Sequence, residues 1–160
     1  MPTTEELIRG LSPAQLKDLA VTLAAMVAPY GVVATDIIEP ARFEEFIDRL
    51  PTLASGQEDS SDLAAECEAV IDQFVDDEPA DAGFYAFGAV VCVYYACCAL
   101  RGDADGGLNA AKRFLDLTGA ADDDGVDGLF ALAEDFVANR SDAVRSEITS
   151  RIVEHAASLH

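Results

Sequence analysis

Carboxylates dominate the side chains of this sequence that could do chemistry. Residues 50–100 contain ten Asp and Glu side chains and no Lys or Arg. Glu68, Asp72 and Asp76 recur at every fourth position, which places them in one stripe on the helix expected there. Together with Glu66 and Asp77 they form what we call the acidic face, a predicted docking surface for a basic protein. The alternative is a solvated face, because the rest of the chain is also acidic.

Magnesium-assisted phosphate chemistry is a second hypothesis for the carboxylates. Glu45 and Asp48 have the E-x-x-D spacing with which helical nucleotide pyrophosphohydrolases hold magnesium, and this spacing puts both on one helix face. The second helix of such a site offers no convincing partner pair. The alternative function is therefore a small helical Mg-dependent phosphohydrolase acting on nucleotide-like substrates.

An acidic stretch at residues 123–134 matches part of an EF-hand calcium loop. Asp127 falls at the fifth position and Glu134 at the twelfth, but Gly125 occupies a position that should supply a ligand. An ordinary loop before a helix, with Asp124 or Asp127 as its N-cap, is the alternative and the favoured interpretation.

Histidine and cysteine are too few, or too poorly placed, to build a catalytic centre. His155 and His160 both lie close to the end of the sequence, and we expect His155 to be a surface helix residue. The four cysteines, three of them in one apolar run, are expected to be buried and reduced. No zinc, triad or phosphate-loop motif is present. We therefore predict no catalytic residue, no metal ligand and no cofactor.

Composition narrows the class of protein further. The chain has 160 residues, 51% of them hydrophobic, with 30 acidic and 10 basic side chains and a net charge of −20. Its apolar content excludes a disordered acidic tail and suits one domain over residues 1–160. Its charge argues against binding nucleic acid or an anionic membrane. The Lys-poor, Ala- and Asp-rich usage is typical of a high-GC bacterial or salt-adapted proteome. The absence of a recognisable export signal predicts a cytoplasmic protein.

Apolar residues recur with helical spacing almost everywhere, and no stretch favours a strand over a helix. Helices are expected from Pro13 to about Ala28, from Pro40 to 53, over 61–74, 84–100 and 105–119, and one or two more over 129–156. Ser12 and Gln15 should form a capping box before the first helix, and Ser61 should cap the third. Gly102 and Gly119 should end the fourth and the fifth. The pattern predicts an all-α fold, a single-domain bundle of six or seven helices around a central apolar helix at about 84–100.

The central helix could also be read as a membrane span. Residues 82–100 carry no charge and approach the length that crosses a bilayer. Their content is Gly, Ala, Cys and Tyr rather than Leu and Ile, which favours a helix buried inside a bundle. We predict no membrane association.

Several sequence features follow one another in a recognisable order between residues 7 and 118. They are a helix ending in Met26-Val27-Ala28-Pro29-Tyr30, a Phe-containing helix at 43–53, and the segment DDEPADAGFYAFGAVV leading into C-V-Y-Y-A-C-C-A-L. This order resembles the YjaG-like family of uncharacterised bacterial all-helical proteins. The resemblance implies an all-α fold and assigns no functional residue.

The function expected from these observations is that of a non-catalytic interaction module. Its acidic face would bind a basic protein surface, as an immunity protein, inhibitor or adaptor does. Long-range attraction between opposite charges would speed the encounter.

Overall fold

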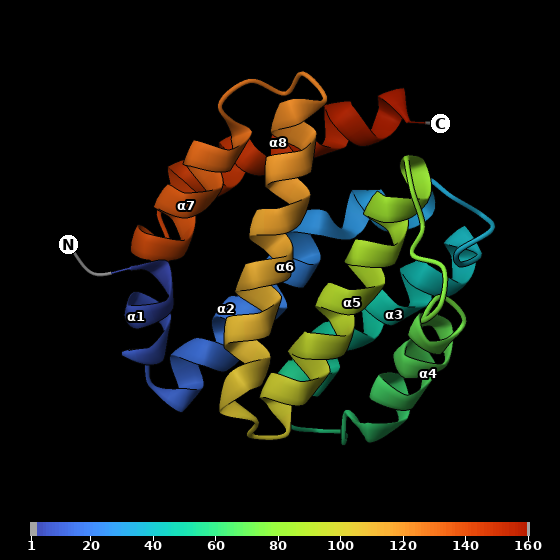
Figure 1. Cartoon of the computed structure of the whole chain (residues 1–160). Coiled ribbons are helices and arrows are strands. Elements are labelled where there is room, and N and C mark those ends of the chain that lie inside the picture. Colours follow the sequence, from blue (N-terminus) through green and yellow to red (C-terminus); the bar gives the residue numbers. More distant parts are fainter. Residues whose placement is uncertain (1–2, 160) are drawn as a thin grey trace.

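Helices make up the regular structure of residues 3–159, which the computed structural model describes, and no strand occurs among them. The predicted all-α bundle is confirmed (Figure 1). Within this described range there are eight α-helices where the pattern predicted six or seven, because a short helix precedes residue 13 and residues 129–158 form two helices. The elements are α1 (Thr4–Arg9), α2 (Pro13–Val27), the 3-10 helix η1 (Ala28–Val32), α3 (Pro40–Ala54), α4 (Ser61–Asp72), α5 (Ala82–Leu100), α6 (Ala104–Asp123), α7 (Leu129–Asn139) and α8 (Asp142–Ser158).

Local sequence signals set several helix boundaries as expected. Ser12 and Gln15 form a capping box before α2, in which each side chain accepts the other residue's backbone N–H, at 3.2 and 2.9 Å. Pro13 and Pro40 occupy the first positions of α2 and α3. Gly102, with φ +92°, follows α5 and turns the chain toward α6.

The junction between α6 and α7 differs from the prediction. Helix α6 continues through Gly119, where the expected helix ended, and a Cβ at this position would lie 3.4 Å from the ring of Phe130 of α7, an ordinary contact. Asp124 lies at the C-terminal end of α6, so the prediction that it or Asp127 caps α7 is wrong. The residue at that N-cap position is Gly128, and the carboxylate of Asp122 instead accepts the backbone N–H of Phe130 at 3.1 Å.

Helix α4 is shorter than its apolar pattern indicated. It ends at Asp72 rather than at Phe74, and the next residues turn so that Phe74 packs edge-on against Phe87 of α5, with ring centroids 5.7 Å apart. Ser60, not Ser61, occupies the N-cap position, and its hydroxyl donates to the backbone carbonyl of Cys97 at 3.0 Å. Helix α4 is therefore fastened to α5 at both of its ends.

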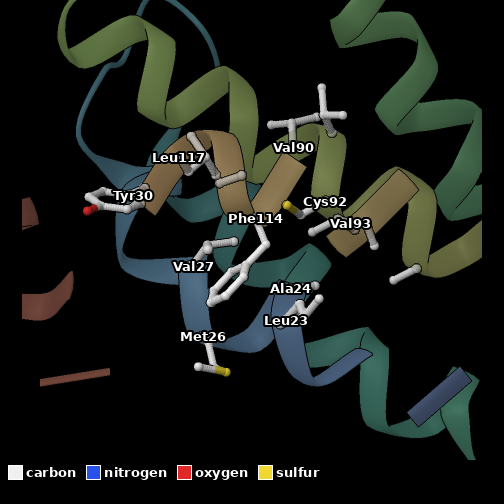
Figure 2. Close-up of a cluster of buried hydrophobic side chains, with 14 of the residues drawn as sticks. Leu23, Ala24, Met26, Val27, Tyr30, Val90, Cys92, Val93, Phe114 and Leu117 are labelled. Carbon is white, nitrogen blue, oxygen red and sulfur yellow. The ribbon is translucent and has the colours of Figure 1, made fainter. Parts of the chain in front are cut away.

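Helix α5 is the centre of the bundle, as predicted, and packs against α6, α2 and α4. Figure 2 shows buried side chains of these helices together in the core, among them Leu23 and Val27 of α2, Cys92 of α5 and Phe114 of α6. Where α6 begins, a Cβ on Gly106 would lie 2.6 Å from the backbone nitrogen of Ala99. Only glycine allows the backbones of these two helices to approach so closely.

Helix α5 is also the one helix in the described part of the chain that is long and apolar enough to cross a membrane. In its most apolar window, 78% of the residues are buried against the rest of the bundle. This arrangement is compatible with the core helix of a soluble protein.

Elements far apart in the sequence lie side by side at the two ends of the chain. Helix α1 packs against α7 and α6, and both α2 and η1 contact α8 (Figure 1). The last helix thus closes over residues near the start of the chain. Any site between η1 and α8 depends on contacts across most of the sequence.

Candidate functional site

The acidic face is divided between a helix and the segment that follows it. Glu68 and Asp72 are exposed on α4, four residues apart and so on the same side of the helix. Asp76 and Asp77 are exposed too, but they lie beyond the end of α4. The prediction of one continuous helical stripe is therefore wrong, because the turn that docks Phe74 on α5 interrupts it.

One member of the acidic face already has a partner within the molecule. The carboxylate of Glu66 lies 2.6 Å from the guanidinium of Arg49 on α3 and accepts a hydrogen bond from it. This hydrogen bond raises the pKa of Arg49 above its ordinary value. Among the residues that the structure describes, no other carboxylate between positions 58 and 81 forms an ion pair.

One large apolar side chain is exposed within residues 58–81, which we call the acidic segment. Val75 is 72% exposed, and it directly precedes Asp76 and Asp77 in the sequence. The segment ends at Asp81, a non-glycine residue with φ +57°, which turns the chain into α5. The surface therefore offers one apolar contact point surrounded in sequence by unpaired carboxylates.

The carboxylates considered for metal binding do not converge. Glu45 and Asp48 are both exposed on α3. Within residues 3–159, no group of three or more His, Cys, Asp or Glu side chains is arranged to hold a metal ion. In the stretch considered for calcium, Asp123 belongs to the last turn of α6 while Glu134 lies on α7.

The four thiols are buried and free, as predicted. Burial raises the pKa of Cys92 to about 12, and burial together with the neighbouring Cys98 raises that of Cys97 to about 12. A nucleophilic cysteine needs a lowered pKa and access to solvent. These side chains therefore act as small apolar residues of the core.

A buried polar cluster that the sequence did not suggest lies between η1, α5 and α8. His155 is only 9% exposed, so the prediction that it is a surface residue is wrong. Its Nδ1 lies 2.8 Å from the hydroxyl of Tyr30, which is fully buried. The imidazole packs edge-on against the rings of both Tyr30 and Tyr85, with centroids 5.5 and 5.0 Å apart. We call these three residues the Tyr–His–Tyr cluster.

A carboxylate closes this cluster on the side of the α6–α7 junction. Tyr85 donates its hydroxyl proton to Oδ2 of Asp124 at 2.6 Å. The same Oδ2 lies 3.8 Å from Nε2 of His155, which is beyond hydrogen-bond distance but close enough for charge to act. Asp124 thus anchors one end of a polar chain that runs through His155 to Tyr30.

The hydrogen bonds fix the tautomer of the imidazole. The buried Tyr30 hydroxyl has no other acceptor among the described residues, so it donates to Nδ1 of His155. Nδ1 is therefore unprotonated, and the neutral ring carries its proton on Nε2, toward Asp124. An imidazole in this state presents an N–H, and no free nitrogen lone pair, to the side that faces Asp124.

Burial controls the ionisation of the cluster. It lowers the pKa of His155, although the negative charge of Asp124 acts in the opposite direction. It raises the pKa of Tyr30, with a further contribution from Asp124, and that of Tyr85, where the hydrogen bond to Asp124 adds to the effect. All three side chains are thereby held uncharged at neutral pH.

An open pocket of about 410 Å³ adjoins the cluster. Arg151, at its wall, donates to the backbone carbonyl of Asp127 at 2.6 Å and to the carboxylate of Glu147 at 2.8 Å. The first bond ties α8 to the α6–α7 junction, and the second, within α8, holds the guanidinium in place. The residues that line the pocket are Asp124, Gly125, Val126, Asp127, Arg151, Glu154, His155 and Ser158.

The sequence contained one usable signal for the buried histidine. Ile148, Ile152 and His155 are spaced i, i+4 and i+7, so His155 falls on the inward face of α8 with the two isoleucines. Nothing in the local sequence indicated that Tyr30, 125 residues away, would be its partner. That pairing depends on how η1 and α8 meet in the folded chain.

No family model matches this chain, and neither the curated proteins nor the solved structures gave a match.

Proposed function

We propose that this protein is a non-catalytic interaction module whose acidic face binds a basic protein surface. One observation carries the proposal. Between positions 58 and 81 the structure displays nine exposed carboxylates without an ion-pair partner in the described chain, while the tenth, Glu66, is paired with Arg49. Unpaired charges of one sign attract an oppositely charged partner over a distance and speed its approach.

The exposed valine strengthens this proposal. Charge sets how fast two proteins associate and how they are oriented as they meet. The binding energy of a protein interface comes mainly from a few apolar or aromatic contacts that exclude water. Val75 supplies one such contact beside Asp76 and Asp77. The partner surface should therefore combine Arg or Lys side chains with a small apolar depression, as on the cationic target of an inhibitor or immunity protein, or on the ligand of an adaptor.

The cellular setting proposed here is the bacterial cytoplasm. Four free and buried thiols support a reducing compartment. Membership of the YjaG-like family stays a prediction, and it would not alter the proposed function because it assigns no binding residue.

The test is capture of partners from a lysate of the source organism by two charge-reversal baits. The first bait carries Glu68, Asp72 and Asp76 changed to Lys. The matched control bait carries Glu44, Asp116 and Glu134 changed to Lys, three exposed carboxylates outside the acidic segment and without ion-pair partners in the described chain. Both baits change the net charge by the same amount, so a difference between them reports position rather than charge.

A basic protein that binds the native chain and the control bait, is lost with the first bait, and is released by moderate salt would support the proposal. Val75→Ser should then weaken the same complex without changing its salt dependence. If the same proteins, or none, bind all three chains, the acidic face serves solvation. Magnesium would next be added to the native protein, because a site at Glu45 and Asp48 would raise its Tm.

A further inference from the structure

The Tyr–His–Tyr cluster joins the last helix to elements near the start and middle of the chain. Tyr30 belongs to η1, Tyr85 to α5 and His155 to α8, and Asp124 adds the end of α6. The hydrogen bond between Tyr30 and His155 is buried and spans 125 residues. It uses the lone pair of an imidazole nitrogen, which exists only while that nitrogen is unprotonated.

We propose that the Tyr–His–Tyr cluster is an acid-sensitive latch, in which protonation of His155 releases the C-terminal half of α8 from η1 and α5. This inference is independent of the acidic face and of the partner proposed for it. It rests on the direction of one hydrogen bond and on the burial of both groups that make it.

Protonation of His155 changes Nδ1 from a hydrogen-bond acceptor to a donor. A second proton on the imidazole ring occupies Nδ1, so this nitrogen must donate where it previously accepted. The Tyr30 hydroxyl can turn to accept that bond, but its own proton then has no acceptor among the described residues. A buried donor without a partner costs about 1–3 kcal/mol. Moving α8 outward removes this cost, because water then reaches both groups.

The pKa of His155 is set by two opposing influences, its burial and the charges that surround the imidazole. Asp124, from α6, faces Nε2 and favours the protonated ring, and it is the one charge that opposes the lowering of the pKa of His155 by burial. Tyr30 and Tyr85 are held neutral. On the pocket side, α8 contributes Arg151 and Glu154.

The remaining charged neighbours of α8 lie in the pocket beside His155 or at the other end of the helix. Asp127, in the junction after α6, is a pocket residue whose backbone carbonyl is bonded to Arg151. Asp18 of α2 and Arg140, at the end of α7, line a small cavity with Asp142 and Arg145 at the start of α8. Asp142 and Arg145 precede His155 by 13 and 10 residues, so they lie about 15–20 Å from it along the helix axis.

The sign of the pH effect follows from these relations. An unfolded histidine titrates near 6.5, while the folded His155 titrates below that value. The docked state therefore keeps its full stability above about pH 6.5 and loses it as the pH falls through this range toward the folded pKa. Titration of carboxylates acts oppositely in a chain of charge −20, since acid reduces its self-repulsion.

Hydrogen exchange read by mass spectrometry at pH 7.5 and pH 5.0 tests the latch, with rates corrected for the intrinsic pH dependence of exchange. In the native protein, protection over residues 151–158 should fall severalfold relative to α5, because protonation of His155 favours the released state, in which its pKa is higher. His155→Gln, which stays neutral, should show no such fall. His160→Gln, the matched control, should behave as the native chain does.

An NMR titration of the His155 Cε1 proton gives a second, independent readout. Its midpoint should lie below 6.5, and Tyr30→Phe should raise it, because that change removes the hydrogen bond that favours the neutral ring. A midpoint at or above 6.5 would overturn the latch. So would equal protection of residues 151–158 at both pH values, or an acid-induced loss of protection that persists in His155→Gln.

Discussion

The acidic face and the Tyr–His–Tyr cluster are both polar, but water solvates the polar groups of the first, whereas partners within the protein bind those of the second. On the acidic face the carboxylates point into water, and Glu66 is the one member with an ion-pair partner in the described chain. In the cluster the hydroxyls of Tyr30 and Tyr85 both have partners, and among residues 3–159 no fully buried side-chain nitrogen or oxygen lacks a hydrogen bond. Water can solvate an exposed carboxylate, whereas a buried hydroxyl must find its partner within the fold.

This contrast predicts where the free energy of unfolding resides. Replacing Tyr30 by Ala should cost about 3–5 kcal/mol, because it removes a fully buried ring and leaves a cavity between η1, α5 and α8. Urea unfolding followed by far-UV circular dichroism would measure the loss at pH 7.5. A cost below about 1 kcal/mol would mean that the cluster does not hold the last helix in place.

A smaller effect is expected at the other tyrosine of the cluster. Tyr85→Phe keeps the ring and removes only the hydroxyl that donates to Asp124 at 2.6 Å. Because the side chain of Asp124 is 53% exposed and water can replace the donor, the cost should be about 1 kcal/mol. The same urea titration would detect it as a lower midpoint with an unchanged slope. A cost equal to that of Tyr30→Ala would contradict the ranking.

The smallest effect is predicted on the acidic face, and it has the opposite sign. Asp72→Lys replaces a repulsive pair with Glu68 by an attractive one, and it places a positive charge in the last turn of α4. Both changes stabilise a helix, together by about 0.5 kcal/mol at low ionic strength. Thermal unfolding in 0.02 M and 0.5 M NaCl would measure the gain, which salt should remove. The tyrosine variants serve as controls, since salt should leave their costs nearly unchanged.

The parts of the fold that the sequence predicted correctly depend on local chemistry. Ser12, Pro13 and Pro40 mark helix starts through their own side chains, and the uncharged run over α5 identified the central helix. The boundaries predicted wrongly depend on distant contacts. Helix α6 continues past Gly119, which lies against Phe130 of α7, and α4 ends before Phe74, whose ring packs on that of Phe87.

The same distinction explains what could be predicted of the candidate sites. Sequence counting located the acidic segment, since net charge requires no knowledge of the fold. It could not locate the Tyr–His–Tyr cluster, whose members lie at positions 30, 85 and 155 and meet only after η1, α5 and α8 have packed. It also missed the pairing of Glu66 with Arg49, which joins two helices.

The aromatic content of the chain gives this architecture a built-in optical probe. The protein has four tyrosines and no tryptophan, so its near-ultraviolet circular dichroism and intrinsic fluorescence arise mainly from tyrosine. Tyr30 and Tyr85, with ring centroids 4.8 Å apart, report on the contact of α8 with η1 and α5. Tyr94 and Tyr95, with ring centroids 5.6 Å apart, report on the C-terminal half of α5. Detachment of the last helix should therefore change the part of the near-ultraviolet signal that arises from Tyr30 and Tyr85, without any label and before the helices themselves unfold.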